Sequence, residues 1–111
     1  MEINEYQALA MRTINADISK NDMLLNSVMG LSGESGEAIE ILKKHLFHGK
    51  PLDRDHLIKE LGDVAWYLAE AASALDIPLE EIFSRNIEKL KARYPDGFST
   101  ERAINRAEGD I

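Results

Sequence analysis

Residues 57–75 decide the fold, and they read Leu-Ile-Lys-Glu-Leu-Gly-Asp-Val-Ala-Trp-Tyr-Leu-Ala-Glu-Ala-Ala-Ser-Ala-Leu. Apolar residues recur there at steps of three and four, which is the period of an α-helix with one face in a core. The expected core positions are Leu57, Leu61, Val64, Ala65, Leu68, Ala72 and Leu75. Asp53 suits the N-cap, and we expect this helix to end near Asp76.

The same period predicts three further helices, over about residues 3–16, 23–47 and 78–93. Pro51, Pro78 and Pro95 fall between the periodic segments, as helix breakers should. Strand signals are weak, because β-branched runs and tight hairpin turns are scarce. We therefore predict an all-α, four-helix-bundle-like single domain over residues 1–111. Its polar C-terminal tail, about 99–111, is expected to dock loosely or fray.

Three glycines interrupt the helix expected over 23–47, namely Gly30, Gly33 and Gly36. Each lowers helix propensity by about 1 kcal/mol, so another advantage must offset that cost. Close packing against a neighbouring helix is the simplest explanation. A kink near Gly30 to Gly33 is the alternative.

The composition excludes several classes of function. The chain has 111 residues, a formal net charge of -7 and no cysteine. The acidic balance argues against nucleic acid as a partner, and the lack of cysteine rules out disulfides and zinc–thiolate sites. No apolar run approaches the roughly 20 residues of a membrane span, and the N-terminus does not resemble a signal peptide. These features predict a cytoplasmic protein with no membrane partner.

Chain length also bears on assembly. One 111-residue helical domain can leave apolar faces uncovered, notably around Trp66, Leu68 and Ala72. We therefore expect self-association as a homodimer, or as a tetramer built from dimers.

Two acid pairs share the same spacing on neighbouring helices. Glu34 and Glu37 are three residues apart, and Glu60 and Asp63 repeat this spacing on the next helix. Residues three apart lie on one helix face, so an antiparallel helix pair can bring all four carboxylates together. Such a cluster is costly unless a cation neutralises it. Oxygen ligands of this kind suit Mg²⁺, with Mn²⁺ as a substitute, better than zinc or copper.

A second interpretation stays open from the residues alone. Acid pairs at this spacing are most often solvated surface charges. The chain would then be a non-enzymatic all-α interaction or oligomerisation module with a solvated acidic face. A di-iron carboxylate bundle is disfavoured, because it needs Glu-x-x-His pairs that neither acid pair provides. Thermal stabilisation by Mg²⁺ would distinguish a metal site from a solvated face.

Several segments together resemble a known family. Gly30-Leu-Ser-Gly-Glu-Ser-Gly-Glu37, followed by Glu60-Leu-Gly-Asp63, is similar to the ExxE…ExxD pattern of MazG-like pyrophosphohydrolases, which belong to the all-α NTP pyrophosphatases. Residues 86–98, Asn-Ile-Glu-Lys-Leu-Lys-Ala-Arg-Tyr-Pro-Asp-Gly-Phe, resemble the third block of that family. Tyr6-Gln7 with Thr13 resembles the start of its single-domain members. The resemblance covers roughly residues 5 to 99.

This resemblance implies an enzyme that hydrolyses a nucleoside triphosphate to the monophosphate and pyrophosphate, with a role in nucleotide pool clean-up. It implies Mg²⁺ ligands at Glu34, Glu37, Glu60 and Asp63. Glu34 or Glu37 would help to deprotonate the attacking water. Oligomers are also implied, with a site that can draw on the first helix of a neighbouring subunit.

The same resemblance implies phosphate contacts from Asn86, Lys89, Arg93 and Tyr94. The first three are spaced so that they share one face of the last long helix. A solvated helix end is the alternative for the two basic residues.

Aromatic and histidine side chains are weaker candidates. Trp66 and Tyr67 could stack on a base, although packing in the core or at a subunit interface is favoured. The three histidines do not form a metal-ligand spacing with the acids.

Overall fold

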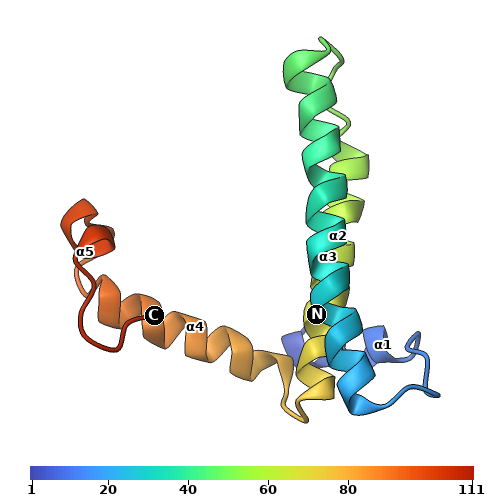
Figure 1. The fold of residues 1–111 in the computed structure, drawn as a ribbon, viewed down its shortest axis with the longest axis horizontal. Coiled ribbons are helices and arrows are strands. Elements are labelled where there is room, and N and C mark those ends of the chain that lie inside the picture. The colour runs from blue at the N-terminus through green and yellow to red at the C-terminus, as the bar shows by residue number, and fades with distance from the viewer. The chain divides into compact units, whose positions relative to one another are not determined.

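The computed structural model describes residues 1–111 and contains five helices and no strand. They are α1 (Ile3–Met11), α2 (Lys20–Phe47), α3 (Arg54–Ala74), α4 (Leu79–Arg93) and α5 (Thr100–Ile104), as Figure 1 shows. The all-α class is confirmed. The chain divides into two compact units, Met1–Leu79 and Glu80–Ile111. The packing of the four principal helices into one bundle stays a prediction.

Helix starts follow from capping side chains. The Asp53 carboxylate accepts a hydrogen bond from the His56 backbone N–H at 3.1 Å, which confirms the predicted N-cap of α3. The second helix was predicted to begin at about residue 23. Ser19 instead caps α2, because its hydroxyl accepts the Asp22 N–H at 3.1 Å, and the helix starts at Lys20.

Helix α1 is shorter than predicted. It ends at Met11 instead of continuing to Ala16. Beyond Met11 the backbone forms tight bonds to the third preceding carbonyl, such as Thr13 N–H to Ala10 O. The Thr13 hydroxyl also donates to Ala10 O at 2.7 Å, so local polar contacts replace the next helical turn.

Helices α2 and α3 form an antiparallel pair, which is the main contact of the first unit (Figure 1). Asn26 donates to both carboxylate oxygens of the fully buried Glu70, at 2.9 and 3.1 Å. One turn further along α2, Gly30 faces the ring of Tyr67. Because α2 numbers rise as α3 numbers fall, Glu34 comes to lie opposite the acids of α3.

Helix α1 packs on α3 through polar contacts. The Trp66 indole N–H donates to the Thr13 hydroxyl at 2.8 Å and to Ala10 O at 3.2 Å. The Gln7 side chain donates to the Ser73 hydroxyl and accepts the Leu79 N–H at 2.7 Å. These bonds hold α1 against α3 at Trp66 and Ser73, which come after the acids Glu60 and Asp63 in the sequence of that helix.

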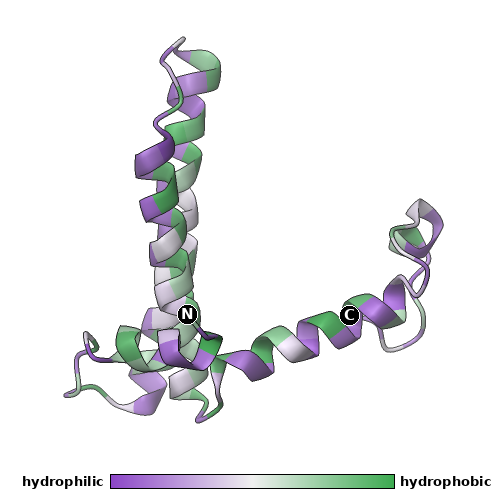
Figure 2. Ribbon diagram, turned by 180° about the vertical axis from the view of Figure 1, so that it is seen from behind, coloured by the Kyte–Doolittle hydropathy of each residue, from purple (hydrophilic) through white to green (hydrophobic).

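The core is built largely from small residues. Its buried apolar members are Ala10, Ile41, Ala69, Ala72, Ala74 and Leu79. Leu61 and Leu75 were predicted to be in the core but are more than half exposed, because α2 and α1 cover only part of α3. Figure 2 shows hydrophobic and hydrophilic residues alternating along α4, the pattern of an amphipathic helix. None of the helices combines the length and apolarity needed to cross a membrane.

The glycines of α2 have separate explanations. The helix runs without interruption from Lys20 to Phe47, so the kink is not needed. A Cβ built on Gly30 would overlap the ring of Tyr67, which confirms close packing at that position. Cβ atoms built on Gly33 and Gly36 would meet open space, so contacts within this chain do not explain those two glycines.

A pair of matched variants tests this difference. Gly30→Ala is expected to lower the free energy of unfolding by about 1–3 kcal/mol, because the Tyr67 ring must shift. Gly33→Ala is expected to raise it by up to about 1 kcal/mol, because it gains helix propensity without a clash. Urea denaturation of both variants measures the two values. Equal changes in both would contradict the packing argument.

Candidate metal centre

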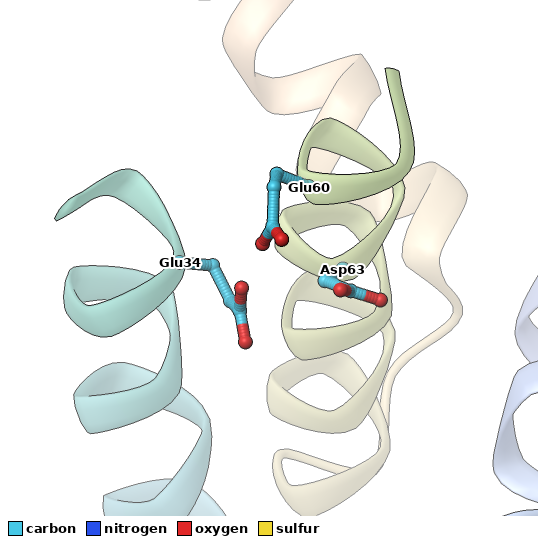
Figure 3. A group of neighbouring side chains, drawn as sticks. All are labelled: Glu34, Glu60 and Asp63. Carbon is cyan, nitrogen blue, oxygen red and sulfur yellow. The ribbon is translucent and has the colours of Figure 1, made fainter. Parts of the chain in front are cut away.

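Helices α2 and α3 bring three carboxylates together where their acidic turns face each other. Oxygens of Glu34, Glu60 and Asp63 all lie within 4.8 Å of one another. Figure 3 shows Glu34 extending from α2 toward the side chain of Glu60 on α3. Glu34 and Glu60 are half-buried, and Asp63 is exposed. The cluster therefore has both a desolvated side and an open side.

Electrostatic repulsion in this cluster acts most strongly on Glu34. Its pKa is raised to about 7, first by a hydrogen bond with Glu60, then by burial, and then by the charges of Glu60, Asp63 and Glu37. Without a cation, the cluster therefore tends to keep a proton at neutral pH. Carboxylate oxygens converging on one point are suitable ligands for Mg²⁺ or Mn²⁺, and a bound cation would remove the repulsion.

The fourth predicted ligand, Glu37, lies outside this group of three. It is exposed and one turn further along α2, where it lines a pocket of about 350 Å³ together with acidic and basic side chains, among them Glu40, Lys44, Lys50, Asp53 and His56. Its charge still helps to raise the pKa of Glu34. The structure thus groups three of the four predicted ligands, and a role for Glu37 stays a prediction.

Aromatic side chains border the open side of the cluster. Trp66 and Tyr67 line a pocket of about 340 Å³ together with Glu34 and Asp63. Their rings meet edge to face, with centroids 5.1 Å apart. Burial, and then the Asp63 charge, raise the pKa of Tyr6 on α1. Helix α1 therefore contributes to the surroundings of the acids, and the contacts of Trp66 with α1 support the packing interpretation of that residue.

His56 was missed as a candidate by sequence reasoning. Its Nε2 lies 3.0 Å from Oε1 of Glu60, one turn along the same helix. No role was expected for His56, because the histidines lack a metal-ligand spacing with the acids. The signal that could have found it is the four-residue step from His56 to Glu60, which places two helical side chains in contact.

The predicted phosphate contacts all lie in the second unit, on α4 and just after it. Asn86 and Lys89 are exposed, whereas Arg93 is engaged in an ion pair. Its Nε donates to Oδ2 of Asp110 and its Nη2 to Oδ1, both at 2.7 Å. The guanidinium carbon also lies 5.9 Å from the centroid of the Tyr94 ring.

The ion pair corrects the expectation of a loose tail. Both side chains of the pair are only 11% exposed, so the tail is held against α4 at Asp110. The hydrogen bond from Arg93, and the charges of Arg93, Arg106 and Lys89, hold the pKa of Asp110 below its usual range. Residues Thr100–Ile104 also form the short helix α5, capped by Ser99. The polar sequence of the tail has little periodicity, and it predicts neither the ion pair nor helix α5.

The raised pKa of Glu34 predicts how metal-free stability depends on pH. The unfolded chain releases this proton near pH 4.5 and the folded chain near pH 7. The contribution to stability is therefore complete below the lower value and is lost as the pH rises through the higher one. In EDTA, the melting temperature of the wild type should fall more between about pH 5 and pH 8 than that of Glu34→Gln. Parallel melting curves for the two proteins would show that Glu34 does not titrate in this range.

Comparisons with known proteins agree with the motifs. The model of the MazG nucleotide pyrophosphohydrolase domain family matches residues 24–98, a span that contains all three clustered acids and α4. The chain is also similar to the gene 37 protein of Mycobacterium phage L5, at 35% identity over 114 aligned residues. That alignment covers 96% of this chain and 100% of the phage protein. No solved structure matches the chain significantly.

Proposed function

Because the chain belongs to the MazG nucleotide pyrophosphohydrolase domain family, we propose that it hydrolyses nucleoside triphosphates to the monophosphate and pyrophosphate with Mg²⁺ as cofactor. The observation that carries the proposal is the convergence of Glu34, Glu60 and Asp63 within 4.8 Å. The raised pKa of Glu34 supports it, because a solvated acidic face would not hold a proton near neutral pH.

In the proposed reaction, water attacks the α-phosphorus and the bond from that phosphorus to the bridging oxygen of the β-phosphate breaks. Glu34, Glu60 and Asp63 would hold the cation, with Glu37 as a fourth ligand or a neighbouring base. Bound Mg²⁺ would supply charge neutralisation on the phosphate oxygens and a lower pKa for the attacking water.

The water must also lose a proton, and Glu34 or Glu37 is the proposed acceptor. Glu34 lies inside the cluster, where its oxygens are within reach of the other two acids. Glu37 lies outside the group of three, so a cation held by Glu34, Glu60 and Asp63 would leave its carboxylate uncoordinated and able to accept the proton. This arrangement favours Glu37 as the base and Glu34 as the ligand.

Cationic and polar groups of the second unit complete the proposal. Asn86, Lys89, Arg93 and Tyr94 would contact the phosphates, since a triphosphate needs donors beyond the cation. Helix α4 is continuous through the first three, so they share one helix face.

A homodimer or tetramer is proposed on the basis of the small core. Large apolar side chains on α2, among them Leu25, Met29 and Ile39, are more than half exposed in one chain. A second copy would remove such surface from water. Light scattering at micromolar concentration tests this part of the proposal, and a strictly monomeric mass would contradict it.

A nucleotide panel tests the proposed reaction. Canonical and modified ribo- and deoxyribonucleoside triphosphates are incubated with the protein and Mg²⁺, and pyrophosphate and orthophosphate are measured separately. Pyrophosphate with equimolar monophosphate is expected, and EDTA should abolish its release. Orthophosphate as the direct product would indicate a different reaction. Neither product, together with no Mg²⁺-dependent rise in melting temperature, would favour the non-enzymatic module.

A further inference from the structure

We propose that His56 is a positioning residue that holds the Glu60 carboxylate in place for the metal. The inference rests on the proposed function, because it concerns one of the proposed ligands. The ring Nε2–H donates to Oε1 of Glu60 at 3.0 Å. His56 itself acts through Glu60 and has no assigned contact with the substrate.

The capped start of α3 holds the backbone of His56 in place. His56 lies in the first turn of α3, where its N–H donates to the capping carboxylate of Asp53 at 3.1 Å. The second oxygen of Asp53 lies 4.0 Å from His56 Nδ1. Asp53 therefore faces one ring nitrogen and Glu60 the other. The contact with Glu60 is the one at hydrogen-bond distance, and the ring is therefore oriented by Glu60 with the Asp53 carboxylate nearby on its other side.

Burial places Glu60 at the centre of this arrangement. Its side chain is 14% exposed, whereas that of His56 is 53% exposed. His56 therefore reaches Glu60 from a more exposed position, while an oxygen of Glu34 on α2 lies within 4.8 Å of an oxygen of Glu60. Side-chain donors that contact a ligand in this way normally set its orientation and basicity.

Repulsion within the cluster explains why such support is needed. Three carboxylates within 4.8 Å favour rotamers that turn the acids apart when no cation is bound. A donor on Glu60 opposes that rotation, because breaking the bond would leave a half-buried oxygen without its partner. Loss of His56 should therefore weaken metal binding without removing any ligand.

The chain offers a matched control on the same helix. Lys59 and Asp55 form another pair with the four-residue spacing, at 3.0 Å, and both side chains are exposed. That pair touches none of the clustered acids. Lys59→Ala therefore removes an equivalent helical contact from the same end of α3 without acting on Glu60.

The test measures Mg²⁺ binding without nucleotide, by titration calorimetry, for the wild type and for His56→Ala, His56→Gln and Lys59→Ala. The Mg²⁺ concentration that gives half-maximal pyrophosphate release is a second readout. His56→Ala should weaken Mg²⁺ binding by about 10-fold, at the lower end of the range for groups that support a ligand. His56→Gln should recover most of the loss, since an amide can donate to Glu60 from the same position. Lys59→Ala should bind as the wild type does.

Mg²⁺ affinity in His56→Ala equal to that of the wild type would overturn the inference. Equal weakening in Lys59→Ala would also overturn it, since the effect would then belong to the end of the helix and not to the contact with Glu60. No recovery in His56→Gln would show that hydrogen-bond donation is not the cause. A wild-type chain that neither binds Mg²⁺ nor releases pyrophosphate would instead overturn the proposed function.

Discussion

Glu60→Gln and Asp63→Asn are each expected to reduce the rate of pyrophosphate release by at least about 100-fold, more than is typical for a residue that only supports a ligand. The metal-free variants should remain folded, with a melting temperature equal to or above that of the wild type. Both substitutions keep the size of the side chain and remove its charge. The combination of lost activity with retained stability is the expected result.

The loss of activity and the retained or raised melting temperature have one electrostatic cause. Without a cation, the three acids repel one another within 4.8 Å, and removing one charge relieves that repulsion. The raised pKa of Glu34 shows the same repulsion, because Glu60 and Asp63 both contribute to it. With a cation, the same substitution removes ligand charge and weakens both metal binding and the activation of water.

Asp55→Asn provides the control for these variants. Asp55 is an exposed acid of α3 that pairs only with Lys59 in this structure and lies outside the cluster. It should leave the rate of pyrophosphate release unchanged. Near wild-type turnover of Glu60→Gln and Asp63→Asn at saturating Mg²⁺ would contradict the proposed site. A fall in melting temperature that accounts for the lost activity would mark the acids as structural.

The spacing of the acids in the sequence predicted their cluster, because the cluster depends on the regular geometry of the helix backbone. Glu60 and Asp63 share a helix face, and an antiparallel partner brings Glu34 opposite them. The same reasoning grouped Glu37 with them, yet that residue lies one turn away and faces another pocket. Two side chains three residues apart point in directions that differ by about 60° around the helix axis, and they are also separated along that axis. Spacing therefore predicts a shared face, but which side chains reach one point depends on the register of the two helices.

Helix boundaries were predictable where a cap dominates and uncertain elsewhere. Asp53 placed the start of α3 correctly, since its carboxylate has one clear backbone partner. Ser19 was overlooked as the cap of α2, although serine is among the preferred N-cap residues. Leu61 and Leu75 were predicted to be buried but are exposed, which shows a limit of predicting the core from periodicity. Periodicity shows that a face is apolar, but it does not show which surface covers that face.

Arg93→Ala is expected to raise the KM for the nucleotide by at least about 10-fold, because it removes a proposed phosphate donor. Asp110→Asn should raise KM by a smaller factor. Asp110 engages Nε and Nη2 of the guanidinium and so orients it, whereas the N–H groups of Nη1 form no bond to Asp110. Asparagine can accept one of these bonds but carries no charge, so Arg93 would be held less firmly.

A double variant separates this positioning effect from an independent one. If Asp110 acts only through Arg93, then Arg93→Ala with Asp110→Asn should have the KM of Arg93→Ala alone. If the increases in KM of the two single variants multiply in the double variant, Asp110 has a separate role. If KM is unchanged in Arg93→Ala, Arg93 is not part of the proposed phosphate site. Hydrogen exchange over residues 100–110 should rise in both single variants, because the ion pair holds the tail.

The ion pair titrates at a much lower pH than Glu34 does, so the two groups can be told apart by their pH dependence. The pKa of Asp110 is lowered below its usual value of 3.8. The stability that the pair contributes is therefore present above the unfolded value and is lost only as the pH falls through the lower, folded value. Between about pH 6 and pH 9 the pair stays charged, so a change of KM with pH in the wild type must come from other groups. The difference in KM between wild type and Asp110→Asn should accordingly be constant across that range, and a difference that disappears toward pH 6 would show that Asp110 is not held by Arg93 in the working enzyme.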